Sequence, residues 1–155
     1  MLVRLARDTD PQVRATALSS LGQLGSEKAQ LAVLDATRRG TTEDRVAAIS
    51  GLSSMDDARA SVQLAALIRD PDPEVAQSAI HSSYNAGPEV DTALTYVLSD
   101  PNGSESMKAT AASQLRTRGT DVDQATEQKI IAIIGAPFGG AGYGGSLYSN
   151  DYIDH

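Results

Sequence analysis

Cysteine and histidine side chains supply many nucleophiles, general bases and metal ligands, and this chain has very few of them. It has no cysteine and two histidines, His81 and His155, which excludes a thiolate nucleophile, a cysteine-type zinc site and a histidine-rich metal site. His81 can titrate near neutral pH and act as an acid or a base, but the sequence places no Ser, Asp or Cys constellation beside it. We therefore interpret His81 as a surface residue and predict a non-enzymatic protein with no catalytic residue, metal or cofactor.

The other segment that could carry chemistry is glycine-rich and lies at the C-terminal end. Residues 136–155 contain Pro137 and five glycines, a composition that does not form a helix. A phosphate-binding loop needs a Lys-Ser/Thr pair after its glycines and a strand before them, and the sequence shows neither. The segment does carry four of the six aromatic residues of the chain, which suit the anchors of a docking segment. They are Phe138, Tyr143, Tyr148 and Tyr152.

The overall composition is that of one acidic, helical domain. The 155 residues are enough for a single continuous core, and the 41% that are hydrophobic are mostly small aliphatic residues that suit close-packed helices. The net charge of −7 and the pI near 4.7 argue against a nucleic-acid surface, which needs clustered Lys and Arg. No apolar run is as long as a membrane span, and residues 1–10 lack the apolar stretch of a signal peptide. We therefore expect a cytoplasmic protein that neither binds nucleic acid nor inserts into a membrane.

Helix starts recur at a fixed spacing along the chain. Asp10-Pro11 and Asp72-Pro73 each combine an N-cap acceptor with a proline at the first helical position, where the missing N–H costs nothing. The two pairs lie 62 residues apart (72 minus 10), so half of that distance suggests a repeat of about 31 residues. Steps of 31 or 32 residues also reach Thr41 and Ser104, which can cap a helix in the same way.

Apolar and small residues keep the same phase after each of these caps. Spacings of three, seven, eight and eleven residues from the cap define one face of a helix. The alanine at the seventh position lets neighbouring helices approach closely. In chain order, the predicted core positions are Val13, Ala17, Leu18 and Leu21; Asp44, Ala48, Ile49 and Leu52; Val75, Ala79, Ile80 and Ser83; and Met107, Ala111, Ala112 and Leu115.

A first apolar helix precedes each turn, so the repeating unit is a pair of helices. The first helices are expected to end at Asp8, Arg39, Asp70 and Asp100, and a fifth begins after Thr120. Glycines expected to end helices are Gly25, Gly87 and Gly119 after second helices, and Gly40 and Gly135 after first helices. Because little chain precedes the first turn, the first unit is expected to be a shortened cap or the continuation of a longer protein. The period predicts an α-solenoid of about four to five helix pairs over residues 1–135, followed by a Gly/Tyr-rich non-helical tail over residues 136–155.

The motif Asp10-Pro11-Gln12-Val13-Arg14, followed by Ala17-Leu18 and Leu21–Gly25, resembles the second helix of a HEAT repeat. It is similar to the short bacterial HEAT-like repeats that also occur in phycobilisome bilin lyases, and the resemblance covers about residues 2–135. It implies an all-α HEAT-like solenoid in which a basic residue after the Val pairs with an Asp before the turn, joining adjacent repeats. In this chain the paired residues would be Arg14, Arg45 and Lys108 with Asp8, Asp70 and Asp100.

The face of the second helices opposite the core is small, polar and weakly acidic, and in arrays of this kind it usually lines the concave side. It can be a plain solvated surface or a groove for a protein segment. In the third repeat Ala76 replaces the basic residue, and Ser83 and Ala86 replace leucines, so this repeat is expected to pack less firmly or to contact a partner. The candidate partner-binding residues are Glu43, Glu74, His81 and Tyr84 on the solenoid, with Phe138, Tyr143, Tyr148 and Tyr152 in the tail.

These features predict a protein–protein interaction scaffold, either a subunit or the C-terminal segment of a larger assembly, whose partners are proteins or neighbouring subunits. The tail is predicted to dock either on residues 128–134 of its own chain or on a neighbouring subunit. The alternative, implied only by the resemblance, is a bilin-lyase-like factor that holds an open-chain tetrapyrrole during its attachment to a partner's cysteine. An acidic regulator of a basic partner is less favoured, because the charge is evenly spread along the chain.

Overall fold

The computed structural model describes residues 1–135, and this part of the chain forms helices and no strand. Apart from the short first helix, each has ten to fourteen residues. The helices are α1 (Leu2–Leu5), α2 (Pro11–Leu21), α3 (Glu27–Arg39), α4 (Thr42–Ser53), α5 (Ala58–Ile68), α6 (Pro73–Ser82), α7 (Glu89–Ser99), α8 (Glu105–Arg118) and α9 (Gln124–Ile134).

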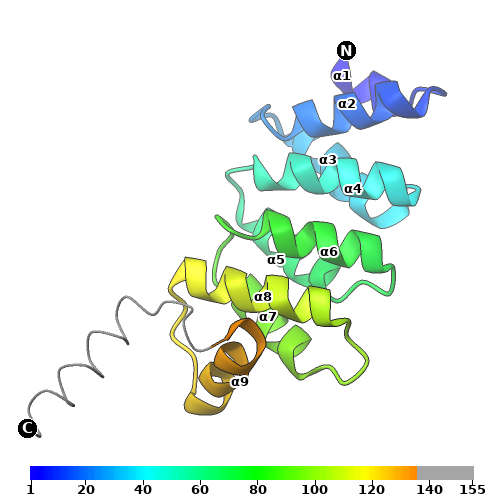
Figure 1. The fold of residues 1–155 in the computed structure, drawn as a ribbon. Coiled ribbons are helices and arrows are strands. Elements are labelled where there is room, and N and C mark those ends of the chain that lie inside the picture. Colours follow the sequence, from blue (N-terminus) through cyan, green and yellow to red (C-terminus); the bar gives the residue numbers. More distant parts are fainter. Residues whose placement is uncertain (136–155) are drawn as a thin grey trace, which may run out of the picture.

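Consecutive helices form pairs, and the pairs stack into two layers (Figure 1). In one layer α2, α4, α6 and α8 each pack against the next, and in the other α1 packs on α3, α5 on α7 and α7 on α9. Each pair can bury its apolar face only against its neighbours. The described chain is therefore an all-α solenoid, which confirms the predicted fold class. The glycine-rich tail lies outside the described residues.

All four predicted caps begin a second helix. The side chains of Asp10, Thr41, Asp72 and Ser104 accept hydrogen bonds from backbone N–H groups two or three residues later, at 2.8, 3.2, 3.0 and 3.2 Å. Each such cap contributes about 1 kcal/mol to the stability of its helix. The repeat of about 31 residues inferred from the sequence is therefore the structural repeat.

The predicted core face is the buried face. Every core position predicted after the caps is buried except Val13 and Met107, which are half-buried. The alanines at the seventh position after the cap are at most 2% exposed, because α2, α4, α6 and α8 meet there. Small side chains at this position keep the second helices close together along the whole stack.

Two helices end earlier than predicted. α2 stops before Gly22, and α6 stops before Ser83, whose hydroxyl donates to the Ile80 carbonyl at 2.7 Å and competes with helix continuation. Gly25 and Gly87 therefore lie in the loops that follow and do not cap these helices. The glycines that do cap helices as predicted are Gly40, Gly119 and Gly135.

The crossing of α2 and α4 depends on two glycines that the repeat pattern did not single out. A Cβ added to Gly22 would lie 1.9 Å from the Gly51 carbonyl oxygen, and one added to Gly51 would lie 2.6 Å from the Leu18 oxygen. Ala47 of α4 is only 9% exposed, and its carbonyl accepts a hydrogen bond from Ser19 of α2. The backbones of the two helices are therefore in direct contact.

We expect Gly22→Ala to destabilise the protein by about 1–3 kcal/mol, since the added methyl group overlaps the α4 backbone. Gly22 has ordinary helical φ and ψ values of −61° and −26°, so without this overlap alanine would be favoured by up to about 1 kcal/mol. Gly25→Ala is the control, because nothing lies within 4 Å of its Cβ position. Urea unfolding followed by circular dichroism measures both variants. Equal stability of Gly22→Ala and the wild type would contradict the close crossing.

Candidate functional site

Partly buried charged side chains form polar contacts between adjacent repeats. Arg45 on α4 pairs with Asp70, which precedes α6, and its Nη1 lies 3.2 Å from Oδ1. Its Nε also donates to the Thr37 carbonyl at 2.8 Å. Thr42 at the start of α4 donates to Asp72, the cap of α6, at 2.7 Å. The ion pair between Arg45 and Asp70 is the one that the resemblance implied for this repeat.

The other two predicted pairs are different. Arg14 donates to the backbone carbonyl of Asp8 at 2.9 Å, and its ion pair is with Asp44 of the next repeat, at 3.0 Å. Position 39, where the partner carboxylate would stand, holds an arginine. Lys108 contacts Glu105 on its own helix at 3.4 Å and makes no ion pair with an Asp before a turn. The series of pairs is therefore shorter and less regular than predicted.

The third repeat is well packed at two positions where the sequence predicted weaker packing. Ala76 is 1% exposed and Ser83 is fully buried. The Ser83 hydroxyl is bonded to its own helix, so its burial leaves no unpaired group. The expectation that this repeat packs less firmly is not met at these two positions.

One contact that the sequence did not indicate holds the third and fourth repeats together. Arg118 at the end of α8 has a side chain only 9% exposed, and its Nε donates to Asp91 at 2.7 Å. Its Nη1 and Nη2 donate to the carbonyls of Ser83, Ala86 and Gly87 at 2.6, 3.0 and 3.0 Å. One guanidinium thus ties α8 to the loop between α6 and α7. Its partners lie 27 to 35 residues away, so no local motif marks it.

The candidate residues on the solenoid lie in the second-helix layer, two of them near helix starts and two near the end of α6. Glu43 and Glu74 are exposed in the first turns of α4 and α6, at the same place in the repeat. His81 is exposed near the end of α6, and Tyr84 just after it is 53% exposed. Seven residues of helix, or about 10 Å, separate Glu74 from His81. The candidate tail residues Phe138, Tyr143, Tyr148 and Tyr152 lie outside the described part of the chain.

His81 belongs to a small polar network. Gln77 lies 3.0 Å from its Nε2 and also donates to Thr110 of α8 at 3.1 Å. Gln114 of α8 lies 3.5 Å from the His81 carbonyl. These contacts link α6 to α8 across the exposed face. Within residues 1–135 no group of three His, Cys, Asp or Glu side chains is arranged to hold a metal ion.

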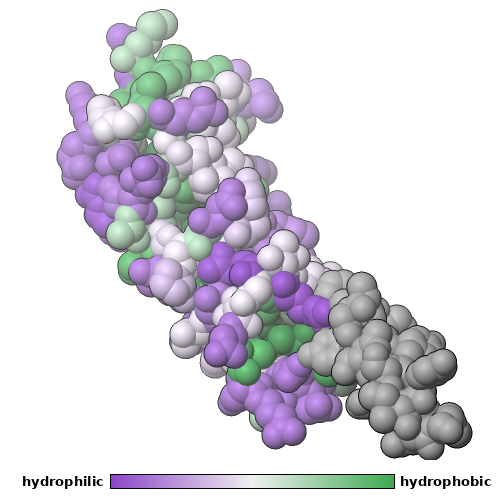
Figure 2. All heavy atoms as spheres, turned by 90° about the vertical axis from the view of Figure 1, so that its left-hand side faces the viewer, coloured by the Kyte–Doolittle hydropathy of each residue, from purple (hydrophilic) through white to green (hydrophobic). Residues whose placement is uncertain are grey.

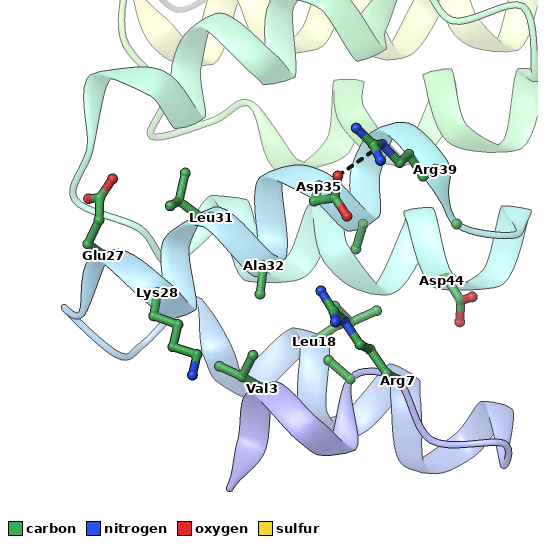
Figure 3. Close-up of a pocket in the computed structure, with 13 residues that line it drawn as sticks. Val3, Arg7, Leu18, Glu27, Lys28, Leu31, Ala32, Asp35, Arg39 and Asp44 are labelled. Carbon is green, nitrogen blue, oxygen red and sulfur yellow. Dashed lines mark ion pairs between the residues drawn. The ribbon is translucent and has the colours of Figure 1, made fainter.

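A groove of about 800 Å³ opens at the N-terminal end of the stack, between α1 and α3 (Figure 3). Val3, Leu18 and Ala32 line its apolar floor, with the half-exposed Leu31 at its rim. Apolar surface is visible at this end of the molecule and again near the opposite end, with mostly polar surface between them (Figure 2). We call this feature the N-terminal groove.

An exposed ionic cluster lies at one rim of this groove. Arg59 of α5 binds Glu27 of α3 through two hydrogen bonds of 2.9 Å and also contacts Asp57, the cap of α5. These bonds hold the pKa values of the Glu27 and Asp57 carboxyls below their ordinary range, and they raise the pKa of Arg59. The cluster joins α3 to α5.

Stacked helix pairs with these caps and inter-repeat contacts define a helical repeat protein. Residues 1–27 match the family model of the HEAT repeat, and this match supports a HEAT-like repeat architecture for the stacked helix pairs. HEAT repeats are generally scaffolds for protein interactions, and the family is typically non-enzymatic. No curated protein matches the chain. None of the helices within residues 1–135 is long and apolar enough to cross a membrane.

We expect Arg118→Ala to lower the free energy of unfolding by about 3 kcal/mol or more, because it leaves Asp91 and several carbonyls without their donor. Arg118→Lys should recover only part of this loss, since an ammonium group cannot reproduce the guanidinium fork. Arg39→Ala is the control: its pair with Asp35 is exposed, and such pairs contribute less than about 1 kcal/mol. Chemical unfolding of the three variants tests the ranking, and equal losses for Arg118→Ala and Arg39→Ala would refute it.

Asp72 should make stability depend on pH in acid. The Thr42 hydroxyl, and after it the amides of Glu74 and Val75, hold the pKa of Asp72 below its ordinary value of 3.8 in the folded chain. The unfolded chain therefore takes up the proton first as the pH falls. The stabilisation is complete above the unfolded value and is lost as the pH falls through the folded value.

The matched pair Thr42→Ser and Thr42→Val tests this expectation. Thr42→Ser keeps the hydroxyl donor and should keep the acid dependence of stability. Thr42→Val removes the donor and should give a shallower loss of melting temperature below pH 4, because less of the stability is then linked to proton uptake by Asp72. Identical acid profiles for Ser and Val would show that this bond does not tune Asp72.

Proposed function

We propose that this chain is a non-enzymatic scaffold for protein–protein interaction within a larger assembly, in which residues 136–155 act as a docking element. The general scaffold role of HEAT repeats supports the first part. The second part rests on the sequence of the segment, which concentrates aromatic residues between glycines.

The observation that carries the proposal is the pair of unengaged carboxylates on the second-helix layer. Glu43 and Glu74 are exposed at equivalent places on adjacent helices, and neither makes a side-chain hydrogen bond or ion pair within residues 1–135. The neighbouring acidic residues Asp44, Asp70 and Asp72 are all engaged in holding the repeats together. A rigid frame thus presents a small acidic surface that is free to meet a partner.

Tyr84 and His81 extend this surface at the other end of α6. Tyr84 combines an apolar ring with a polar tip and is half-exposed, a property that suits a contact residue. His81 is oriented by Gln77 and is exposed. We expect a partner that bridges both ends of α6 to present donors to Glu74 and an apolar group to Tyr84.

Affinity capture with the full chain, followed by cross-linking mass spectrometry, tests the proposal. Glu43→Gln/Glu74→Gln should reduce capture of a specific partner, because it removes both free carboxylates without adding bulk. Truncation after Pro137 should reduce it independently. The control is Glu89→Gln/Asp121→Asn, which removes two exposed carboxylates outside the second-helix layer. If neither the paired substitution nor the truncation alters capture relative to the control, the proposed surfaces are not used.

The bilin-lyase alternative rests on the type of repeat alone, and one added measurement separates it. Coexpression with a bilin-accepting protein and a tetrapyrrole source should leave the acceptor without covalent colour if the chain is a scaffold. Covalent attachment that depends on this chain would instead establish the lyase function.

A further inference from the structure

The two helices that border the N-terminal groove differ in length. α1 has four residues, whereas α3 has thirteen, so α1 covers only part of the α3 surface. Leu31 of α3 remains 50% exposed, and Val3 and Ala6 remain half-buried. The result is an apolar trough with room for one extended segment of chain.

The charges around the trough distinguish it from the rest of the surface. Its three carboxylates are already engaged by arginines: Glu27 by Arg59, Asp35 by Arg39 and Asp44 by Arg14. Arg7 and Lys28, which also line it, make no ion pair or side-chain hydrogen bond within residues 1–135. Both side chains point into the space between the two helices (Figure 3).

Unpaired cations are rare elsewhere in the described chain. All thirteen Lys and Arg residues lie within residues 1–135, and ten of them have a side-chain partner there. The remaining three are Arg4, Arg7 and Lys28, which lie together at the N-terminal end and line adjoining hollows. Within residues 1–135 of this acidic chain, the cations without a side-chain partner therefore lie at this end, beside apolar surface.

We infer that the N-terminal groove binds the segment 138–155 of a second copy of this chain, joining copies head to tail. The segment has four aromatic residues that can fill the apolar trough, two acidic residues, Asp151 and Asp154, and no Lys or Arg. Its aromatic and acidic groups match the apolar floor and the free cations of the groove. The inference specifies a partner for the docking element and rests on that part of the proposed function.

A second copy fits the geometry better than the same chain does. The segment follows α9, and α1 and α9 lie at opposite ends of the stack (Figure 1). Packed helices of one layer lie about 9 Å apart, so the four steps from α9 to α1 amount to roughly 35 Å. A glycine-rich chain of 20 residues spans on average only about 25 Å. The groove of a neighbouring copy is not held at this fixed separation from α9, so it can lie within reach of the segment.

The test uses one full-length double variant and one truncation, examined by analytical ultracentrifugation. Arg7→Glu/Lys28→Glu keeps the segment but repels it from the groove, and truncation after Pro137 keeps the groove but lacks the segment. Each alone should associate at least about tenfold more weakly than the wild type, since like charges replace complementary ones or the ligand is missing. An equimolar mixture of the two should form a heterodimer, because one supplies the segment and the other the groove.

The controls separate the groove from general charge and from misfolding. Arg69→Glu/Lys129→Glu makes the same change in charge at exposed sites on α5 and α9 and should associate like the wild type. Leu31→Asp alters the groove at a half-exposed side chain and should weaken association without lowering the melting temperature. Higher salt should weaken the wild-type association.

Four results would overturn the inference: a wild type that stays monomeric, a truncated chain that still associates, a groove variant that associates like the wild type, or a mixture that forms no heterodimer. A monomeric wild type whose α1 and α3 amides lose hydrogen-exchange protection on truncation would instead show docking within one chain. Because these measurements use the purified chain alone, their failure is distinct from a failure to capture another protein.

Discussion

The structure depends on a turn in which two carboxylates each make two kinds of bond. Asp70 accepts a hydrogen bond from the Asp72 amide at 3.0 Å, which shapes the turn, and it also receives Arg45 from the preceding repeat. Asp72 caps α6 and accepts from Thr42 of the preceding repeat. The same two carboxylates therefore fix where α6 begins and attach its repeat to the preceding one. At this junction the coupling keeps the phase of the cap and the phase of the core in agreement.

The same turn also explains where the pattern changes. Asp8 and Asp100 each accept from the amide two residues later at 2.9 Å, as Asp70 does. At the corresponding place in the second repeat stands Arg39, which has no acceptor to offer. There Asp44, at a position held by Val13 in the first repeat, supplies a capping box and the partner of Arg14. A carboxylate is retained at the junction although its place in the chain has moved.

The sequence predicted those features that depend on short-range spacing. The caps, the period and the buried alanines follow from rules that act within one or two helical turns, and all of them are confirmed. The partner of Arg14, the contacts of Arg118 and the backbone contact of Gly22 with Gly51 were not predicted. Each of these joins atoms about 30 residues apart through the crossing geometry of particular helices, and no local rule encodes that geometry. For the candidate site, the exposure of Glu43, Glu74 and His81 could be predicted because these residues lie opposite the core face. A partner could not be predicted, because no spacing rule within the repeat specifies one.

The charged side chains differ in whether they have a partner within the solenoid. Ten of the thirteen Lys and Arg side chains contact a side chain or backbone group within residues 1–135. The contacts between repeats resist movement of one repeat against the next, because breaking a partly buried pair leaves a charge without its partner. Within residues 1–135, the cations without a side-chain partner lie together at or beside the N-terminal groove, whereas exposed carboxylates remain on the second-helix layer and elsewhere. Docking of the acidic, aromatic segment 138–155 in the groove of a second copy, as inferred above, would be a heterologous contact, in which unlike surfaces meet. The internal pairing that holds the solenoid together therefore also limits the places at which its cations are available to bind an acidic group.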